Sequence, residues 1–437
     1  MVHTLETVEA HAPRSERHAR VKPGEIAIGV IIGRTSEFFD FFVFAIASVL
    51  VFPQLVFPFV DPLTGTLYAF AIFALAFVAR PFGTLIFMAI DRAYGRGPKL
   101  TVALILLGTS TVCIAFLPSY GAVGSISIWA LAILRIGQGI ALGGTWDGLA
   151  SLLSLNAPEN RRGWYAMVPQ LGAPLGLIVA SALFAFFVGN LSTDDFFSWG
   201  WRYPFFVAFA LNVVALFARL RIVETSEFRT LFESRDLQPT PVFATIRKQG
   251  RTILIGAFAP LASFALFHMV TVFPLSWIFL YTREAPVRFL TIECVAAVFG
   301  ILAIFASGMI ADRVGRRNLL AACALMIAVF SGFAPQLLDG GIIGETVFMV
   351  LGFILLGLSF GQSSGAVASS FSTFYRYTGS ALTSDLAWMF GAGFAPFVGL
   401  FLASEFGLIA AGAYLLSGAI CTLVALLANR GTGVSQL

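Results

Sequence analysis

The sequence GRTSEFFDFFVF, which runs from Gly33 to Phe44, places one arginine and two carboxylates inside a long apolar run. A charge at the centre of a bilayer costs about 2.5–3.5 kcal/mol on insertion scales and more in simulations. Arg34, Glu37 and Asp40 therefore need a reason to be there. Ionisable groups at such depth usually mark the path of an ion or a substrate, so the stretch favours transport.

The composition outside this stretch indicates a membrane protein. Hydrophobic residues make up 58% of the chain and charged residues 11%, whereas a soluble domain carries about 25% charged residues. Apolar runs long enough to cross about 30 Å of hydrocarbon recur throughout, and each should be a helix because lipid offers no partner to free backbone groups. We predict an all-α membrane protein with twelve transmembrane helices, roughly at residues 25–51, 66–90, 100–117, 126–153, 164–189, 202–221, 252–281, 289–311, 318–338, 343–373, 380–403 and 407–428.

The basic residues predict the orientation of the helices. Most of the 27 lysines and arginines, including those from Arg219 to Arg251, fall in segments that would share one side of the membrane. The loops on the other side carry only Arg202, Arg283 and Arg288. Because cytoplasmic loops are rich in Lys and Arg, both termini should be cytoplasmic in a bacterial-type inner membrane. The net charge of +4 then reflects topology, and no nucleic-acid partner is expected.

An internal repeat predicts two halves. The sequence DRAYGR at Asp91–Arg96 returns as DRVGRR at Asp312–Arg317, about half a chain later. The expected organisation is a tail at 1–24, a six-helix half at 25–222, a cytoplasmic linker at 223–250, a second half at 251–429 and a tail at 430–437. The charged residues of the repeat could form latches that one conformation keeps and another breaks, or could simply be basic turns. These candidate gating residues are Asp91, Arg92, Arg96, Asp312, Arg313, Arg316 and Arg317.

These motifs resemble those of the major facilitator superfamily, whose signature is Gly-x-x-x-Asp-Arg-x-Gly-Arg-Arg. Gly308–Arg317 matches it, whereas the first copy has one residue more before Gly95. Within that superfamily the chain resembles the metabolite:proton symporters. The residues that carry this likeness are Glu37–Phe41, Arg80–Gly83, Arg135–Gly139, Arg161–Gly163 and Gly200–Arg202. The resemblance implies a twelve-helix, monomeric transporter that works by alternating access.

Two positions depart from that family's pattern. Thr145 stands where the family has a glutamate, which leaves Asp147 as the nearest acid, and Arg34 stands where members have a small or hydroxyl residue. Asp147 is a candidate gating residue.

The three charges of the first helix should face the same cavity as an arginine of the fourth helix. Arg34, Glu37 and Asp40 follow at three-residue steps and so share one face. Glu37 and Arg135 lie at similar depths, and the resemblance implies that the first and fourth helices line the central cavity. We predict that Glu37 or Asp40 carries the proton and that Arg135 is its switchable partner. The alternative is a set of ion pairs that only holds these two helices together.

Arginines in the first half indicate an anionic substrate. Arg34, Arg80 and Arg135 outnumber the two acids, and a guanidinium matches a carboxylate in bidentate geometry. Alternatively, Arg34 only neutralises Glu37. The candidate substrate-binding residues are Arg34, Gln138, His268, Trp277, Tyr281, Gln362 and Trp388, and further candidates for gating are Arg80 and Asp385.

Several functions are disfavoured because their motifs are missing. The sequence contains no Gly-x-x-x-x-Gly-Lys-Ser/Thr and no His-Glu-x-x-His, so neither ATP hydrolysis nor a metal or other cofactor is expected. We predict a proton-coupled secondary transporter that imports a small carboxylate. The alternatives are a zwitterion such as betaine or proline, or export of an organic acid. A channel or an intramembrane enzyme is a third possibility that the midplane charges fit less well.

Overall fold

The structure is a computed structural model that describes residues 23–145, 153, 157–223, 238–282, 284–363 and 371–428. These residues form helices joined by short loops, and no strand occurs among them. Eleven helical spans in the described residues are long and apolar enough to cross a membrane. The helix α1 (Pro23–Leu50) is a further long helix, which carries the three charges of the quoted stretch.

The first half of the chain contributes six long helical segments. They are α1, α3 (Pro62–Tyr94), α4 (Arg96–Ala115), α6 (Ile126–Gly144), a segment of α8 (Arg162–Met167), η2 (Val168–Leu171) and α9 (Gly172–Asn190), and α11 (Tyr203–Val223). Short helices α2 (Phe52–Leu55), α5 (Tyr120–Val123) and α10 (Thr193–Ser198) lie in the loops. Pro169 lies in the 3₁₀ turn η2, because proline has no N–H to continue the helical hydrogen bonds.

The second half repeats this pattern with more interruptions. Its first span is divided into α13 (Val242–Phe258), α14 (Leu261–Thr271) and α15 (Phe273–Tyr281), and the breaks fall at Pro260 and just before Pro274. The other segments are α16 (Pro286–Val314), α17 (Arg316–Leu338), α18 (Gly341–Phe360), α20 (Arg376–Ala387) with the π-helix η5 (Trp388–Gly393) and α21 (Ala395–Phe406), and α22 (Leu408–Ala428).

A helix begins before the apolar run that we assigned to the seventh span. Helix α13 starts at Val242, inside the stretch 223–250 that we expected to be linker. Its first turns carry Arg247 and Lys248 and extend the helix beyond its apolar part, which hydropathy alone does not detect.

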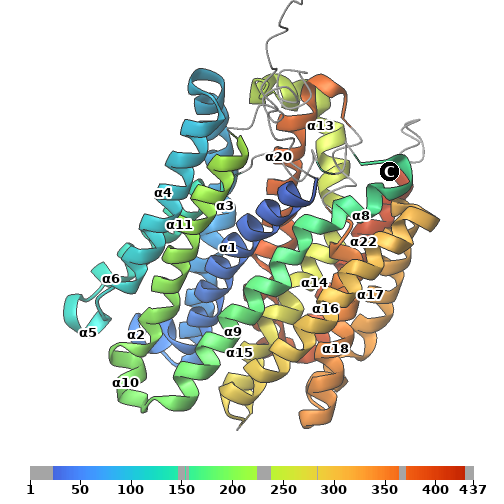
Figure 1. Cartoon of the computed structure of the whole chain (residues 1–437). Helices are drawn as coiled ribbons and strands as arrows, with labels where there is room; N and C mark the ends of the chain where they lie inside the picture. The colour runs from blue at the N-terminus through green and yellow to red at the C-terminus, as the bar shows by residue number, and fades with distance from the viewer. Residues whose placement is uncertain are drawn as a thin grey trace, which may run out of the picture.

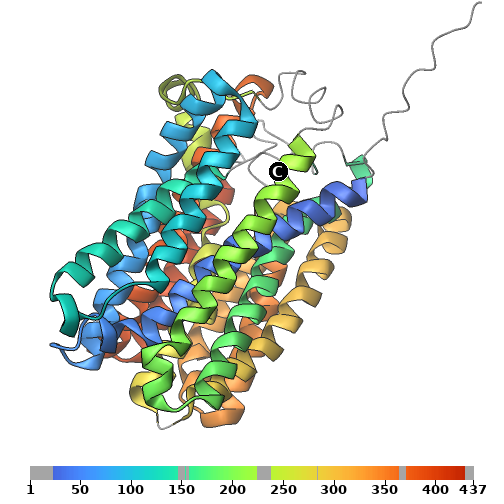
Figure 2. The same ribbon diagram turned by 60° about the vertical axis from the view of Figure 1, so that its left-hand side comes forward.

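The start of α1 and the end of α22 lie at the same end of the bundle, which we call the terminal face (Figure 1). The short helices α2, α5 and α10 lie at the other end, which we call the opposite face. Figure 1 shows α3, α4, α6 and α11 on one side and α16, α17, α18 and α22 on the other, and the turned view of Figure 2 keeps the start of α1 at the terminal face.

Several helix contacts join the halves. Helix α9 packs along α16, and α3 packs against the segment α20–η5–α21. These contacts reach both faces, because α8 also touches α16 near the terminal face and α15 touches α1 and α3 near the opposite face. Charged side chains on α1, α3 and α6 therefore lie inside a bundle whose two halves meet around them.

Candidate functional site

The two acids of α1 have different surroundings. Glu37, which is 7% exposed, accepts hydrogen bonds from two arginines: Arg34 Nη1 at 2.7 Å and Arg219 Nη2 at 2.5 Å. Arg219 also donates to the carbonyl oxygen of Thr145 at 3.1 Å. Two guanidinium groups thus hold one carboxylate, which fixes the rotamer of Glu37 and compensates its charge.

Arg219 is a member of the site that the sequence did not single out. It was grouped with the basic residues of one side, but the structure buries its side chain within α11, where it is 3% exposed. The Arg219 guanidinium lies against Gly33 on α1, and a Cβ at position 33 would collide with it. The signal in the sequence is the pair of Gly33 and an arginine near the end of the sixth span.

Asp40 is surrounded by neutral hydrogen-bonding groups. Its Oδ1 accepts a hydrogen bond from Thr111 Oγ1 at 2.7 Å and a long one from Gln138 Nε2 at 3.5 Å. The same α1 face places Ser36 Oγ against Asn212 Oδ1 at 2.8 Å. In the described part of the chain, no basic nitrogen lies within 4.0 Å of Asp40, so this buried carboxyl lacks the direct counter-charge that Glu37 has.

Arg135 makes no direct ion pair with Glu37 or Asp40 in this structure. It donates from Nη1 to Gln138 Oε1 at 3.0 Å and from Nε to the carbonyl oxygen of Phe73 at 3.2 Å. Its guanidinium lies over the rings of Phe44 and Phe73, at 4.1 and 4.7 Å from their centroids. Cation–π contacts take the place of a carboxylate here, and Gln138 links Arg135 to Asp40.

A pocket of about 340 Å³ opens beside these groups. Its polar lining comes from Arg34, Glu37 and Arg80, and its apolar lining comes from Phe38, Phe41, Phe77, Leu142 and Trp388. These residues belong to α1, α3, α6 and η5, so the pocket lies between the two halves.

One wall of the pocket carries an ion pair that crosses between the halves. Arg80 Nε on α3 lies 2.8 Å from Asp385 Oδ1 on α20, and Thr84 donates to the other carboxylate oxygen at 2.5 Å. The structure thus brings together two candidate gating residues, Arg80 and Asp385. The pair is almost fully buried, so removing either partner would leave a buried charge without compensation.

The other candidate substrate residues divide into two groups. Trp388 lines the pocket, and His268 is buried beside it, with its ring stacked on Phe41 at 5.0 Å. Trp277 and Tyr281 stack on each other on α15, outside this pocket, and Tyr281 is 47% exposed. Gln362 also lies away from the pocket, where it donates to the carbonyl oxygen of Gly163 at 3.1 Å.

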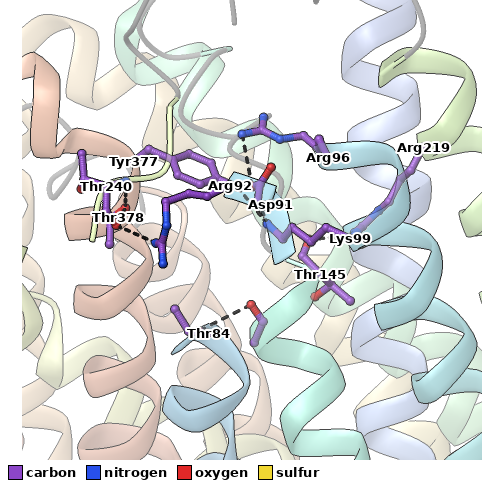
Figure 3. A network of polar contacts seen from close by, with 11 residues as sticks. Thr84, Asp91, Arg92, Arg96, Lys99, Thr145, Arg219, Thr240, Tyr377 and Thr378 are labelled. Carbon is purple, nitrogen blue, oxygen red and sulfur yellow. Dashed lines mark hydrogen bonds and ion pairs between the residues drawn. The ribbon is translucent and has the colours of Figure 1, made fainter. Parts of the chain in front are cut away.

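The repeated charged motifs lie near the terminal face, and each reaches across to the other half. Asp312 accepts hydrogen bonds from the backbone amides of Gly163 at 2.6 Å and Trp164 at 3.1 Å. Asp91 Oδ2 lies 3.4 Å from Lys99 Nζ, and the Tyr377 hydroxyl donates to it at 3.2 Å (Figure 3). The other basic residues of the motifs surround these two aspartates.

Their contacts are as follows: Arg92 donates to the carbonyl oxygen of Thr240, Arg96 lies over the ring of Tyr377, Arg316 donates to Gln362, Arg317 donates to the carbonyl oxygen of Leu426, and Arg313 is exposed in the last turn of α16. Asp147 lies outside the described residues.

A family model described as "Sugar (and other) transporter" matches residues 26–254, which is more than half of the chain. The chain belongs to this transporter family. The inner membrane metabolite transport protein YhjE of Escherichia coli (strain K12) is 35% identical to it over 98% of each chain. The shikimate transporter of the same strain is 30% identical over 87% of this chain and 88% of its own.

Solved structures agree on the fold. The proton:xylose symporter XylE, a major facilitator superfamily protein, matches with a TM-score of 0.69 and 17% identity over 94% of this chain and 95% of its own. The predicted membrane fold and the resemblance to this superfamily are therefore confirmed. The protein is a multi-pass membrane transporter of metabolites and not an enzyme.

The two charged motifs of the transporter have different contacts because of a one-residue offset. Helices α3 and α16 both end at a glycine with positive φ, Gly95 at 84° and Gly315 at 86°. Asp91 precedes its glycine by four residues, whereas Asp312 precedes its glycine by three. One residue rotates a side chain by about 100° on a helix, so Asp312 faces backbone amides of the other half while Asp91 faces side chains.

Replacing Asp312 with asparagine should loosen the terminal face of the transporter. The change removes the charge from two hydrogen bonds, and bonds to charged groups contribute about 1.5–3 kcal/mol each. Met167, buried where α8 and α16 meet, offers a reporter when it is changed to cysteine. We expect thiol modification of Met167→Cys to become about tenfold faster in the Asp312→Asn background. Asp195→Asn, on exposed α10, should leave the rate unchanged, and an equal rate in all three proteins would contradict the latch.

Proposed function

We propose that the transporter imports a small organic anion together with protons by alternating access, with both termini in the cytoplasm of a bacterium. The observation that carries this proposal is the pocket between the halves. It is lined by two arginines, one carboxylate and four aromatic rings. Small-molecule sites are mostly apolar with a few placed polar groups, and the lining of this pocket has that character.

The pocket suggests how an anion would be bound. Arg34 and Arg80 both line it, and planar guanidinium groups bind carboxylates in bidentate fashion. An incoming carboxylate would compete with Glu37 for Arg34 and with Asp385 for Arg80. The second competition weakens an ion pair between the halves, so substrate binding and movement of the halves would be coupled through Arg80.

We assign the proton to Asp40. Glu37 has two arginines as direct partners, which favour its ionised form. Asp40 has only neutral donors in direct contact, with Arg135 reached through Gln138, and a buried carboxylate without a counter-charge is costly. A proton on Asp40 removes that cost. Asp40 can then lose the proton when water enters or when Arg135 moves closer.

A zwitterion is the second candidate substrate. The rings of Phe38, Phe41, Phe77 and Trp388 could bind a trimethylammonium group by cation–π contacts while an arginine holds the carboxylate. The proline/betaine transporter of Escherichia coli (strain K12) is 26% identical over 90% of this chain, which supports this alternative. Export of an organic acid would use the same pocket with the gradients reversed.

Uptake into proteoliposomes tests the proposal. Purified protein is reconstituted and offered labelled mono-, di- and tricarboxylates, aromatic acids, betaine and proline, with and without an inward proton gradient. We expect gradient-driven accumulation of at least one carboxylate. Accumulation of betaine or proline alone would favour the zwitterion, and uptake that ignores the proton gradient would contradict proton coupling.

Replacing Arg34 with alanine should weaken binding of the transported anion. Arg34 lines the pocket, and Glu37 keeps Arg219 as a partner after the change, so the helices should stay in place. Losing a charged hydrogen-bond donor from a buried site costs about 1.5–3 kcal/mol, so KM should rise about tenfold or more with a smaller effect on the maximal rate. Arg34→Lys should recover part of the affinity. An unchanged KM in Arg34→Ala would return Arg34 to the role of neutralising Glu37.

A further inference from the structure

Glu293 is a buried acid that the proposed transport site does not use. It is the eighth residue of α16, about 12 Å or less along the helix from the opposite face at 1.5 Å per residue. Its side chain is 0% exposed and points toward α9 of the other half, where Ser181 Oγ donates to Oε2 at 2.8 Å. The neighbouring Cys294 Sγ lies 3.7 Å from the carbonyl oxygen of Ile178, also on α9. Glu293 is therefore part of the contact between the halves.

The surroundings of Glu293 favour its neutral form. Within the described residues, no basic nitrogen lies within 4.0 Å of it, and Oε1 has no hydrogen-bond partner. An ionised carboxylate with one donor and no counter-charge is unstable in an apolar helix interface. A protonated carboxyl group is tolerated there, because it carries no charge.

The titratable groups on adjoining elements do not change this conclusion. Helix α9 carries no charged residue. Helix α15 contributes Tyr281, α18 contributes Glu345, and α16 itself contributes Cys294 and Arg288, whose guanidinium pairs with Glu284 and lies 4.0 Å from Glu345. Helix α17 has its only basic residues at the terminal face, and α8, η1 (Glu159–Arg161) and η2 contact α16 near that face as well.

We propose that Glu293 is a second proton-binding site, which takes up a proton from water when the halves close at the opposite face and releases it to water when they part there. The inference rests on the alternating access proposed above, in which α9 and α16 must separate at that face. Closure brings Glu293 against Ser181 of α9, whereas opening lets water solvate the carboxylate. Protonation therefore stabilises the closed opposite face, independently of Asp40.

The test follows the opposite face with spin labels on the full-length transporter. In a background whose four native cysteines are replaced by alanine, cysteines at Asp194 on α10 and Ile343 on α18 carry the labels, since both positions are exposed. Distances are measured from about pH 5 to about pH 9. For one proton, we expect the ratio of open to closed populations to rise up to about tenfold per pH unit around its midpoint.

Three variants decide the outcome. Glu293→Gln cannot lose a proton, so its opposite face should stay closed and its distances should change little with pH. Ser181→Ala removes a donor that stabilises the ionised form, so its midpoint should move upward by about half a pH unit or more. Glu345→Gln neutralises a buried acid at similar depth in the same half, beside Arg288 and away from α9, and should respond like wild type.

A pH response in Glu293→Gln equal to that of wild type would overturn the inference. An equal loss of response in Glu345→Gln would also overturn it, because any buried acid would then suffice. If Glu293→Gln fails to fold, the midpoint of Ser181→Ala decides, and an unchanged midpoint would count against Glu293. Failure of the proposed function would look different: uptake would ignore the proton gradient even where the spin-label response to pH depends on Glu293.

Discussion

Transporter with asparagine at position 40 should exchange its substrate but should no longer accumulate it. Asp40→Asn keeps the shape of the side chain and its ability to accept from Thr111, but it cannot bind and release a proton. A gradient of one pH unit stores about 1.4 kcal/mol per proton, enough for about tenfold accumulation. The variant should lose this accumulation entirely, while counterflow between substrate on the two sides remains.

Two other variants make the Asp40 result specific. Thr111→Val removes the strongest donor to Asp40 but leaves the carboxyl, so accumulation should persist with an altered dependence on pH. Asp195→Asn, on the exposed helix α10, should behave like wild type. If Asp40→Asn accumulates substrate as wild type does, the proton does not reside on Asp40. Loss of both exchange and accumulation would instead indicate that Asp40 is needed for binding or folding.

The arrangement of the helices could be predicted from sequence because the bilayer imposes it. Apolar length sets each span, and the repeat of Asp91–Arg96 in Asp312–Arg317 indicates the two halves. The same reasoning does not find the start of α13, because its first turns are polar and hydropathy detects only the apolar part of the helix. The breaks near Pro260 and Pro274 follow from proline chemistry, because proline cannot continue the helical hydrogen bonds.

The members of the site were harder to predict than the spans. Periodicity places Arg34, Glu37 and Asp40 on one face of α1, and the structure keeps them at the centre of the molecule. Periodicity cannot identify the hydrogen-bonding partner of each acid. Arg219 reaches Glu37 because α11 approaches α1 closely at Gly33. The rule that cytoplasmic loops are rich in Lys and Arg would instead place this arginine at the membrane surface.

Contacts between the halves were likewise beyond the sequence. The sequence motifs identify Asp91 and Asp312 as candidate gating residues, but their partners Tyr377 and Gly163 follow only from how the halves are docked. Glu293 escaped notice for a related reason. An acid within about two turns of a helix end can extend toward water, and only the packing of α9 against α16 shows that this one does not.

Removing Glu37 should destabilise the transporter far more than removing Glu37 and Arg219 together. Glu37→Ala removes the carboxylate that Arg219, 3% exposed, contacts at 2.5 Å, and breaking a buried ion pair by removing one member costs about 3–5 kcal/mol. We expect the thermal unfolding midpoint in detergent to fall by about 5–10 °C. In the double variant Glu37→Ala/Arg219→Met, an apolar side chain replaces the buried charge that Glu37 pairs with, so most of this loss should be recovered.

The same pair of variants separates a structural role of Glu37 from proton coupling. If Glu37 serves to hold α1 against α11, the stable double variant should still accumulate substrate on a proton gradient, with Asp40 intact. Accumulation lost in the double variant, despite a recovered unfolding midpoint, would move the proton from Asp40 to Glu37. A midpoint in the double variant as low as in Glu37→Ala would show that Arg219 is not the group that Glu37 compensates. Glu37, which two arginines hold, and Asp40, which has no direct counter-charge, are thus assigned different roles. One thermal measurement and one transport measurement can distinguish these roles.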